Sequence, residues 1–180
     1  MKPASSLFAT IIRFAPLLVV LLAPACHKKD PEPDKATMLA AHSWKSTSSS
    51  LTINGYEGTR TLSGSEVYTL VFGSDGRVTS QAAGSAATSG TWKLQNNDTQ
   101  LVVQTGSSAA QTLQVFELTT SKLSYGLQYD AAAIQQQQAA GTGQMITALI
   151  LLAGSFTFPA NTPTIPANQV TGLQYKINFQ

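Results

Sequence analysis

The segment 66–94 constrains the fold of this chain more than any other, because it carries the signals of three consecutive β-strands. In its first part, the large side chains of Tyr68, Leu70 and Phe72 alternate with their neighbours, which is the period-two pattern of a strand buried on one face. Asp75-Gly76 then predicts a tight turn, since glycine tolerates positive φ and aspartate bonds to nearby backbone amides. A second strand and, after a loop of small residues, a third complete the segment. The chain is therefore expected to be built from antiparallel hairpins.

Similar short segments, separated by turn residues such as Asn54-Gly55, occur along most of the chain. Further strands are expected at 42–47, 51–53, 101–103, 112–118 and 123–129. Short strands at nearly regular spacing favour an antiparallel meander, and such a sheet protects its edges best by closing on itself. A last alternating strand at 173–179 can pair with the first one. The sequence therefore predicts an all-β fold, a single antiparallel up-and-down β-barrel of about eight strands.

The stretch 131–170 is an insertion before the last strand. Residues 131–140 have a helix-forming composition with Ile134 as the one large apolar residue, so they fit a surface helix or a loop. Residues 145–153 form a nine-residue, mainly apolar run that is too short to span a bilayer. This run is expected to be a buried strand or a helix that plugs the barrel, or else an apolar lid over a ligand pocket or a segment resting on a membrane. Residues 159–166, with three prolines, predict an irregular loop.

Residues 1–25 predict a secretory signal peptide. Lys2 and Arg13 give the N-terminal part positive charge, and an apolar run follows from Phe14. The run is shorter than the ~20 apolar residues that cross a bilayer, and Pro16 interrupts it. These residues are therefore expected to direct export and then to be removed.

Cys26, the only cysteine of the chain, follows this segment directly. The residues before it, LAPA, with Leu22 four positions upstream, resemble the lipobox of bacterial lipoproteins, in which the cysteine is acylated and becomes the new N-terminus. The resemblance implies fatty chains such as palmitate on Cys26, a membrane anchor and a place in the bacterial cell envelope. Since His27 and not aspartate follows the cysteine, it implies the outer membrane. Ala23-Pro24-Ala25 also fits an ordinary export cleavage site, so a soluble secreted protein with a free N-terminal cysteine is the alternative.

Residues 26–36 are expected to link this cysteine to a folded domain. Residues 27–35 are charged and proline-rich and have no apolar face, which is typical of a disordered tether. The chain is thus divided into a signal peptide at 1–25, a lipidated cysteine with its tether at 26–36, and a barrel domain at 37–180.

Five pieces of sequence within 39–130 occur in an order that resembles the lipocalin-like domains of small bacterial envelope lipoproteins. They are Trp44 with a leucine a few residues before it, and the stretches LVFGSDGRV, SGTWKL, TQLVVQ and VFELTTSKLSYGL. The resemblance implies a barrel whose first-strand tryptophan plugs one end. The sequence departs from it at His42, because lipocalins often carry glycine two residues before this tryptophan.

Residues that carry enzyme chemistry are scarce. Histidine occurs only at positions 27 and 42, so neither a zinc site nor a Ser-His-Asp triad is expected. An envelope hydrolase with a pair of carboxylates stays as a third hypothesis, because several acidic residues could supply the pair: Glu57, Glu66, Glu117 and Asp130. We expect no catalysis, no metal and no cofactor.

The charge of the chain gives no sign of a nucleic-acid partner. The formal net charge is +2, but loss of the segment that carries Lys2 and Arg13 leaves nine basic residues against nine acidic ones. The only basic cluster is Lys28-Lys29. We therefore expect no nucleic-acid binding.

The remaining candidate for function is the interior of the barrel. A barrel of about eight strands is wide enough either to be filled by side chains or to hold one small ligand. The side chains expected to point inward are Tyr68, Leu70, Phe72, Trp92, Leu101, Val103, Phe116, Leu118, Leu123, Tyr125, Tyr175 and Ile177. The candidate ligand-binding residues are Trp44, Tyr68, Leu70, Phe72, Trp92, Phe116 and Tyr125.

Two hypotheses of function follow from the sequence. In the first, a lipoprotein of the cell envelope binds a small apolar or amphiphilic ligand in a lipocalin-like barrel, without catalysis. In the second, the barrel core is solid, and the lipoprotein has a structural role or docks a protein or glycan through its outer strands or the insertion at 131–170. An apolar internal cavity would favour the first hypothesis.

Overall fold

The computed structural model describes residues 33–180. The expected signal peptide, Cys26 and most of the expected tether lie outside the described residues. The strands of the described chain are β1 (Ser43–Ile53), β2 (Tyr56–Thr61), β3 (Tyr68–Phe72), β4 (Arg77–Ala82), β5 (Thr88–Gln95), β6 (Gln100–Thr105), β7 (Gln111–Leu118), β8 (Leu123–Tyr129) and β9 (Leu173–Phe179). Its helices are α1 (Lys35–Ala40), α2 (Ala131–Ala139) and α3 (Gln144–Leu152), with single 3-10 turns η1 (Gly64–Glu66), η2 (Ala153–Ser155) and η3 (Ala167–Gln169).

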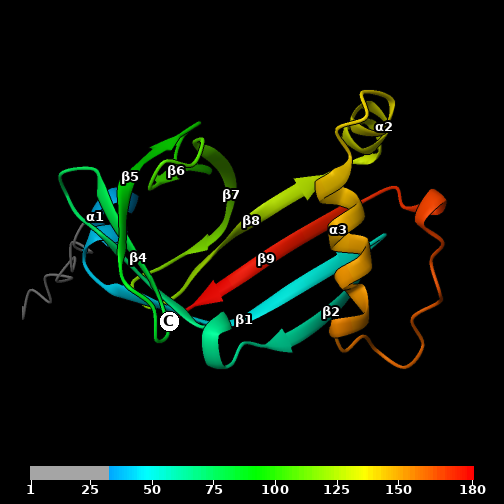
Figure 1. Cartoon of the computed structure of the whole chain (residues 1–180), viewed down its shortest axis with the longest axis horizontal. Coiled ribbons are helices and arrows are strands. Elements are labelled where there is room, and N and C mark those ends of the chain that lie inside the picture. The colour runs from blue at the N-terminus through cyan, green and yellow to red at the C-terminus, as the bar shows by residue number, and fades with distance from the viewer. Residues whose placement is uncertain (1–32) are drawn as a thin grey trace, which may run out of the picture. The chain divides into compact units, whose positions relative to one another are not determined.

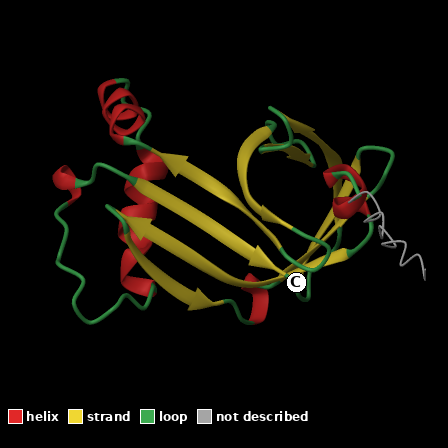
Figure 2. Ribbon diagram, turned by 180° about the vertical axis from the view of Figure 1, so that it is seen from behind, coloured by secondary structure: helices red, strands yellow, loops and turns green. Residues whose placement is uncertain are grey.

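All strands except β2 form a closed antiparallel barrel (Figures 1 and 2). Consecutive strands from β3 to β9 are hydrogen-bonded neighbours, and β1 pairs with β3 on one side and β9 on the other. Residues 46–53 of β1 lie antiparallel to β9, which closes the sheet. The predicted up-and-down barrel, closed by its last strand against its first, is confirmed.

Strand β2 is an addition to this barrel that the sequence pattern does not reveal. It forms a hairpin with the second half of β1, through a turn in which Asn54 and Gly55 have φ values of 50° and 88°. Two positive φ values are the mark of the hairpin turn that Asn-Gly favours, so the predicted turn is confirmed. The strand was missed because its inward positions opposite Leu51 and Ser49 are Gly58 and Arg60, which give no apolar alternation.

Strand β1 is a single strand of eleven residues where the sequence predicts two shorter ones. Trp44 and Leu51 are an odd number of residues apart, which would place them on opposite faces of a regular strand. The register against β9 shifts between Ser46 and Ser48, and this β-bulge resets the alternation. Both side chains are therefore buried on the inner face.

The inner face of β8, β9 and β1 is covered by two different structures. Over one half, the other barrel strands enclose a barrel core of Leu39, Trp44, Leu70, Phe72, Val78, Trp92, Leu101, Leu123, Tyr125 and Phe179. Over the other half, α3 and the chain after it form a helix core of Leu51, Ile53, Ile134, Ile146, Leu149, Phe156, Val170 and Leu173. The two cores meet along β9, whose Phe179 belongs to the first and Leu173 to the second.

The inserted stretch 131–170 supplies the helices that cover the second half. Asp130 caps the start of helix α2, and its carboxylate accepts a hydrogen bond from the backbone of Ala133. The apolar run is a helix and not a strand: α3 lies across the ends of β8, β9, β1 and β2, with Ile146 and Leu149 buried beneath it (Figures 1 and 2). The chain then returns to the sheet, where Thr157 forms a single antiparallel bridge with β2.

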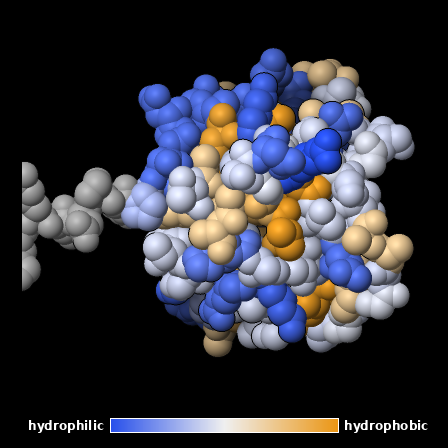
Figure 3. All heavy atoms as spheres, turned by 90° about the vertical axis from the view of Figure 1, so that its left-hand side faces the viewer, coloured by the Kyte–Doolittle hydropathy of each residue, from blue (hydrophilic) through white to orange (hydrophobic). Residues whose placement is uncertain are grey.

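Exposed apolar side chains concentrate on α3. Of the five exposed large hydrophobic residues in the described part of the chain, three lie on this helix: Met145, Leu151 and Leu152. At the other end of the unit, near α1, hydrophilic residues separate the hydrophobic ones into patches (Figure 3). No helix within residues 33–180 is long and apolar enough to cross a membrane.

Candidate ligand-binding site

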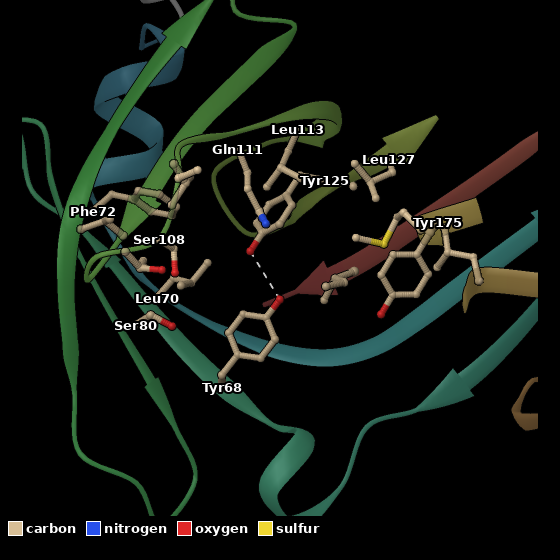
Figure 4. Close-up of a pocket in the computed structure, with 18 of the residues that line it drawn as sticks. Tyr68, Leu70, Phe72, Ser80, Ser108, Gln111, Leu113, Tyr125, Leu127 and Tyr175 are labelled. Atoms are coloured by element: carbon tan, nitrogen blue, oxygen red, sulfur yellow. Dashed lines mark hydrogen bonds between the residues drawn. The ribbon is translucent and has the colours of Figure 1, made fainter. Parts of the chain in front are cut away.

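A cavity of about 440 Å³ lies inside the barrel, where the barrel core meets the helix core. Six strands, the turn between β6 and β7, and helix α3 contribute to its wall (Figure 4). The lining residues are Tyr68, Leu70, Phe72, Val78, Ser80, Val103, Thr105, Ser108, Ala109, Gln111, Leu113, Tyr125, Gly126, Leu127, Met145, Leu149, Leu152, Tyr175 and Ile177. Most of these side chains are apolar, and none of them is charged. The barrel is therefore not filled by its own side chains.

Strands β8 and β9 form one wall of the cavity. Tyr125 lies directly opposite Ile177, and Leu127 directly opposite Tyr175. Directly paired side chains of an antiparallel sheet point to the same face, and positions two apart share that face. The alternation of large residues in both strands therefore turns all four side chains toward the cavity, as the sequence predicts for Tyr125, Tyr175 and Ile177.

Helix α3 covers the mouth of the cavity with one stripe of side chains. Met145, Leu149 and Leu152 are spaced by four and then three residues, so they lie on one face of the helix, and all three line the cavity. Leu149 is only 4% exposed, whereas Met145 and Leu152 are 47% and 46% exposed. The helix is thus an apolar cover whose edges reach solvent, which is the position expected of a lid.

Two tyrosine hydroxyls meet inside the cavity (Figure 4). Tyr68 Oη and Tyr125 Oη are 3.4 Å apart, and either can donate the hydrogen bond. Both rings pack on Phe179, with centroid distances of 5.4 Å for Tyr68 and 5.0 Å for Tyr125. Burial raises the pKa of Tyr68 to about 12 and raises the pKa of Tyr125 well above its ordinary value. Both hydroxyls are therefore protonated and neutral at physiological pH.

When Tyr68 is replaced with phenylalanine, the free energy of unfolding is expected to fall less steeply as the pH rises in alkaline solution. The pKa of Tyr68 is about 12 in the folded chain, against ~10 for an unperturbed tyrosine, so the folded state holds this proton more tightly. The resulting stabilisation is complete below pH ~10 and is lost as the pH rises through ~12. Denaturant unfolding at several pH values across this range measures it. The control is Tyr56→Phe, at an exposed position, and its stability should fall with rising pH as that of the wild type does. If the stability of Tyr68→Phe fell by the same amount, the burial of this hydroxyl would be contradicted.

Trp44 and Trp92 lie in the barrel core and not in the cavity wall. Trp44 Nε1 donates a hydrogen bond to the carbonyl of Leu39 at 2.9 Å, which fastens α1 to the end of the barrel. Trp92 Nε1 donates to the carbonyl of Gly73 at 3.0 Å, and its ring meets Phe72 edge-on. The two tryptophans therefore close the barrel end behind the cavity. The predicted ligand-binding residues that line the cavity are Tyr68, Leu70, Phe72 and Tyr125.

Phe116 lines neither the cavity nor the barrel core. The sequence places it on the same inward face as Leu118, two residues further on. In the structure the register of β7 against β8 shifts between Val115 and Glu117. Because this bulge adds one residue to β7, Leu113 and Val115 before it and Leu118 after it all pack on the barrel core. The prediction of an inward Phe116 was therefore wrong.

The acidic residues considered for a carboxylate pair lie away from the cavity. Glu57 pairs with Lys176 at 2.8 Å, and the hydrogen bond from this ammonium group lowers the pKa of Glu57. Glu66 pairs with Arg60 at 2.7 Å. Asp130 caps the start of α2. These three carboxylates therefore have partners that account for their positions.

Sequence reasoning missed the cavity residues of α3 and of the turn between β6 and β7. Met145, Leu149 and Leu152 were considered only as part of an apolar run, although their spacing of four and three residues is a signal of one helix face. Ser108 in the turn and Gln111 at the start of β7 also line the cavity. Residues in turns follow no period, so nothing in the sequence marks Ser108. Gln111 lies two positions before Leu113 and so shares its face of β7, but as a polar residue it does not stand out in an apolar alternation.

The family comparison concerns the part of the chain that builds most of this barrel. A family model described as a lipocalin-like domain matches residues 41–125, which contain β1 to β7 and the first residues of β8. Comparisons with curated proteins and with solved structures found no match. The closed antiparallel barrel is the fold that this family implies. Residues 41–125 are therefore similar to a lipocalin-like domain, and β9, outside the matched residues, completes the barrel.

Proposed function

We propose that this protein binds a small, neutral and mainly apolar ligand inside its barrel and does not catalyse a reaction. The observation that carries the proposal is the cavity of about 440 Å³, which is apolar except for a few hydroxyl and amide groups. Ligand pockets in proteins typically measure ~300–1,000 Å³ and combine apolar walls with a small number of polar groups. The cavity meets both conditions, and its size favours a ligand of modest length.

The tyrosine pair indicates which polar group such a ligand carries. In the hydrogen bond between Tyr68 and Tyr125, one hydroxyl uses its hydrogen and the other keeps its hydrogen free. The pair can therefore donate one further hydrogen bond, and each oxygen also has lone pairs. A carboxylate or ammonium group would enter a cavity with no opposite charge among its lining residues, which is costly. A ligand with a carbonyl, ether or hydroxyl oxygen fits these groups best.

The position of helix α3 indicates how a ligand could enter the cavity. Its stripe of Met145, Leu149 and Leu152 separates the cavity from solvent, and two of the three side chains are already partly exposed. The helix has no side-chain hydrogen bond at its start, where Gly143 is the cap residue. Movement of this helix is therefore the simplest way to admit an apolar ligand.

We also propose that the domain is held on a membrane of the bacterial cell envelope, the outer membrane, by fatty chains on Cys26. The support is the run of signal-peptide features before this cysteine and its place as the only cysteine of the chain. Metabolic labelling with palmitate tests the assignment. The wild type should carry the label and Cys26→Ala should not, whereas equal labelling of both would exclude Cys26 as the attachment site.

Native mass spectrometry of the protein purified from its own host tests ligand binding directly. A small molecule bound in a one-to-one complex would support the carrier function, and its mass would identify the class of ligand. A clean mass of the free chain, together with no uptake of a neutral hydrophobic dye, would contradict it. The dye titration guards against loss of a weakly held ligand during purification.

Val103→Phe is expected to block the cavity. Val103 lines it, so the larger ring would occupy ligand space, and binding of N-phenyl-1-naphthylamine should weaken about tenfold. Fluorescence titration of this neutral dye measures the change. The matched control is Val102→Phe, one residue earlier on the other face of β6, which should leave the affinity within about twofold. An equal effect of both variants would show that the dye binds elsewhere.

The second candidate function is docking of a protein or glycan through the outer surface. The observation that favours it is the exposed apolar surface of α3, where Leu151 is 78% exposed and does not line the cavity. A polar substitution there, Leu151→Gln, leaves the cavity intact. Loss of a co-purified partner in this variant, with dye binding unchanged, would favour docking over ligand transport.

A further inference from the structure

A second cavity, of about 330 Å³, lies on the other side of α3. Its walls come from the β1–β2 hairpin, from α3 and from the proline-rich segment 159–166, and they include Ile53, Tyr56, Ile150, Phe158, Pro163 and Ile165. Except for the hairpin, these elements belong to the stretch 131–170, beyond the residues matched by the lipocalin-like family model. The cavity is thus a feature that this chain's insertion adds to the barrel.

The two cavities are separated by helix α3. Leu149 and Leu152 face the barrel cavity, whereas Ile150 and Ala153, each one position further along the chain, face the second one. A step of one residue turns a helix by ~100°, so the two pairs lie on different faces. No residue lines both cavities. A ligand in one cavity therefore does not occupy the other.

The segment that forms the outer wall of the second cavity is fastened at both ends. Before it, the backbones of Thr157 and Thr59 exchange hydrogen bonds of 2.9 and 3.1 Å. After it, the side chain of Asn54 donates to the carbonyl of Gln169 at 2.8 Å and accepts from the backbone of Thr171 at 2.7 Å. The wall is therefore held in place on both sides of the hollow that it lines.

One polar group in this wall has no partner. Thr162 Oγ1 is buried and makes no hydrogen bond, and Thr162 lines the second cavity. A buried hydroxyl without a partner is unfavourable, and unused donors are rarer in folded proteins than unused acceptors. The other lining residues are mainly aliphatic, aromatic or proline, and none is charged. Because Oγ1 itself has almost no accessible surface, it reaches the cavity only after rotation of the Thr162 side chain about χ1. A ligand that fills the cavity and offers an acceptor to the rotated hydroxyl would satisfy both features of the wall.

We propose that this second cavity is a separate binding site for a compact neutral ligand, mainly aromatic or hydrocarbon, that accepts one hydrogen bond from Thr162. Tyr56 and Phe158 supply aromatic surface for such a ligand, and the prolines supply rigid apolar surface. The smaller volume selects a more compact molecule than the barrel cavity does. The site does not depend on the barrel cavity being a ligand site.

A pair of probes of nearly equal shape tests the role of the hydroxyl. Acetophenone carries a carbonyl oxygen where α-methylstyrene carries a methylene group, so only the first can accept a hydrogen bond. We expect the full chain to bind acetophenone about 3–10-fold more tightly than α-methylstyrene. Thr162→Val should remove this preference, and Thr162→Ser, which keeps the hydroxyl, should retain it. Equal affinities of the wild type for the two probes, or a preference that survives in Thr162→Val, would overturn the proposal.

Blocking variants identify which cavity the probes occupy. Ala153→Leu narrows the second cavity and should weaken acetophenone binding about tenfold, whereas Val103→Phe in the barrel should leave it unchanged. Methyl NMR spectra should show shifts at Ile150 and Ile165 on titration. The reverse result, with loss of binding in Val103→Phe only, would place the probe in the barrel and overturn the second site while supporting the first. Thermal unfolding of each variant verifies that it is folded.

Discussion

Replacing Trp44 with alanine is expected to lower the free energy of unfolding by about 3–5 kcal/mol. The side chain is 1% exposed, belongs to the barrel core, and donates a hydrogen bond to the carbonyl of Leu39. Alanine would leave a hole at the closed end of the barrel and a carbonyl without its donor. The contact between α1 and the barrel would then be weakened as well. Urea unfolding followed by circular dichroism measures the loss.

Two further variants separate the causes of this loss. Trp44→Phe keeps most of the ring but not the N–H group, so it should cost less than alanine. Lys45→Ala, at the neighbouring exposed position, should change stability by no more than ~0.5 kcal/mol. Because Trp44 does not line the cavity, dye affinity of the folded fraction should be unchanged. If Trp44→Ala were as stable as Lys45→Ala, the tryptophan would not be what holds the barrel end together.

The features that could be predicted from the sequence are those set by neighbouring residues. The Asp75-Gly76 turn depends on one glycine, which has a φ of 78°, and the alternation around Leu70 needs only a strand with one buried face. The final strand at 173–179 was predicted from the same kind of alternation. From such local features the closed barrel followed, together with the inward orientation of seven residues that line its cavity, four of which were candidate ligand-binding residues.

The features that could not be predicted depend on a partner strand. The bulges in β1 and β7 add a residue relative to β9 and β8, and no residue type marks either position. Phe116 was placed inward because the alternation was carried through the second bulge without this shift. Strand β2 was missed for a related reason, since Gly58 opposes Leu51 at a point where the ring of Phe158 occupies the space of a side chain.

For the insertion at 131–170, the composition could be used to predict a helix-forming and an apolar segment, but not where these segments lie in the fold. An apolar run of nine residues is compatible with a strand, a plug or a lid, and its contacts decide between them. Leu149 touches the barrel cavity and Ile150 the second cavity only because α3 lies across the sheet. The second cavity also needs the proline-rich segment to return over the β1–β2 hairpin. Both arrangements depend on contacts between residues that are far apart in the sequence, and no local sequence pattern predicts such contacts.

Gly126→Ala is expected to be the most disruptive single substitution in the cavity wall. An alanine Cβ at this position would overlap the backbone carbonyl oxygen of Tyr175 in β9. A backbone atom cannot turn aside as a side chain can, so β8 and β9 would have to separate. Overpacking of buried sites typically costs ~1–3 kcal/mol and occasionally more, and we expect a loss at or above the top of this range. This close approach of two strands also explains why glycine stands between two large residues in the stretch LSYGL.

The control for this substitution is Gly172→Ala, just before β9, where an added Cβ meets nothing within 4 Å. Since alanine restricts the unfolded chain more than glycine does, this variant should be neutral or more stable by up to ~1 kcal/mol. The temperature of thermal unfolding should therefore fall in Gly126→Ala and should not fall in Gly172→Ala. Separation of β8 from β9 also displaces Tyr125 and Leu127 relative to their partners, so dye affinity should fall in Gly126→Ala alone. If the stability and the dye affinity of Gly126→Ala were both unchanged, β8 and β9 could accommodate the added methyl group without altering the cavity. The spacing of these two strands would then not determine which ligand binds.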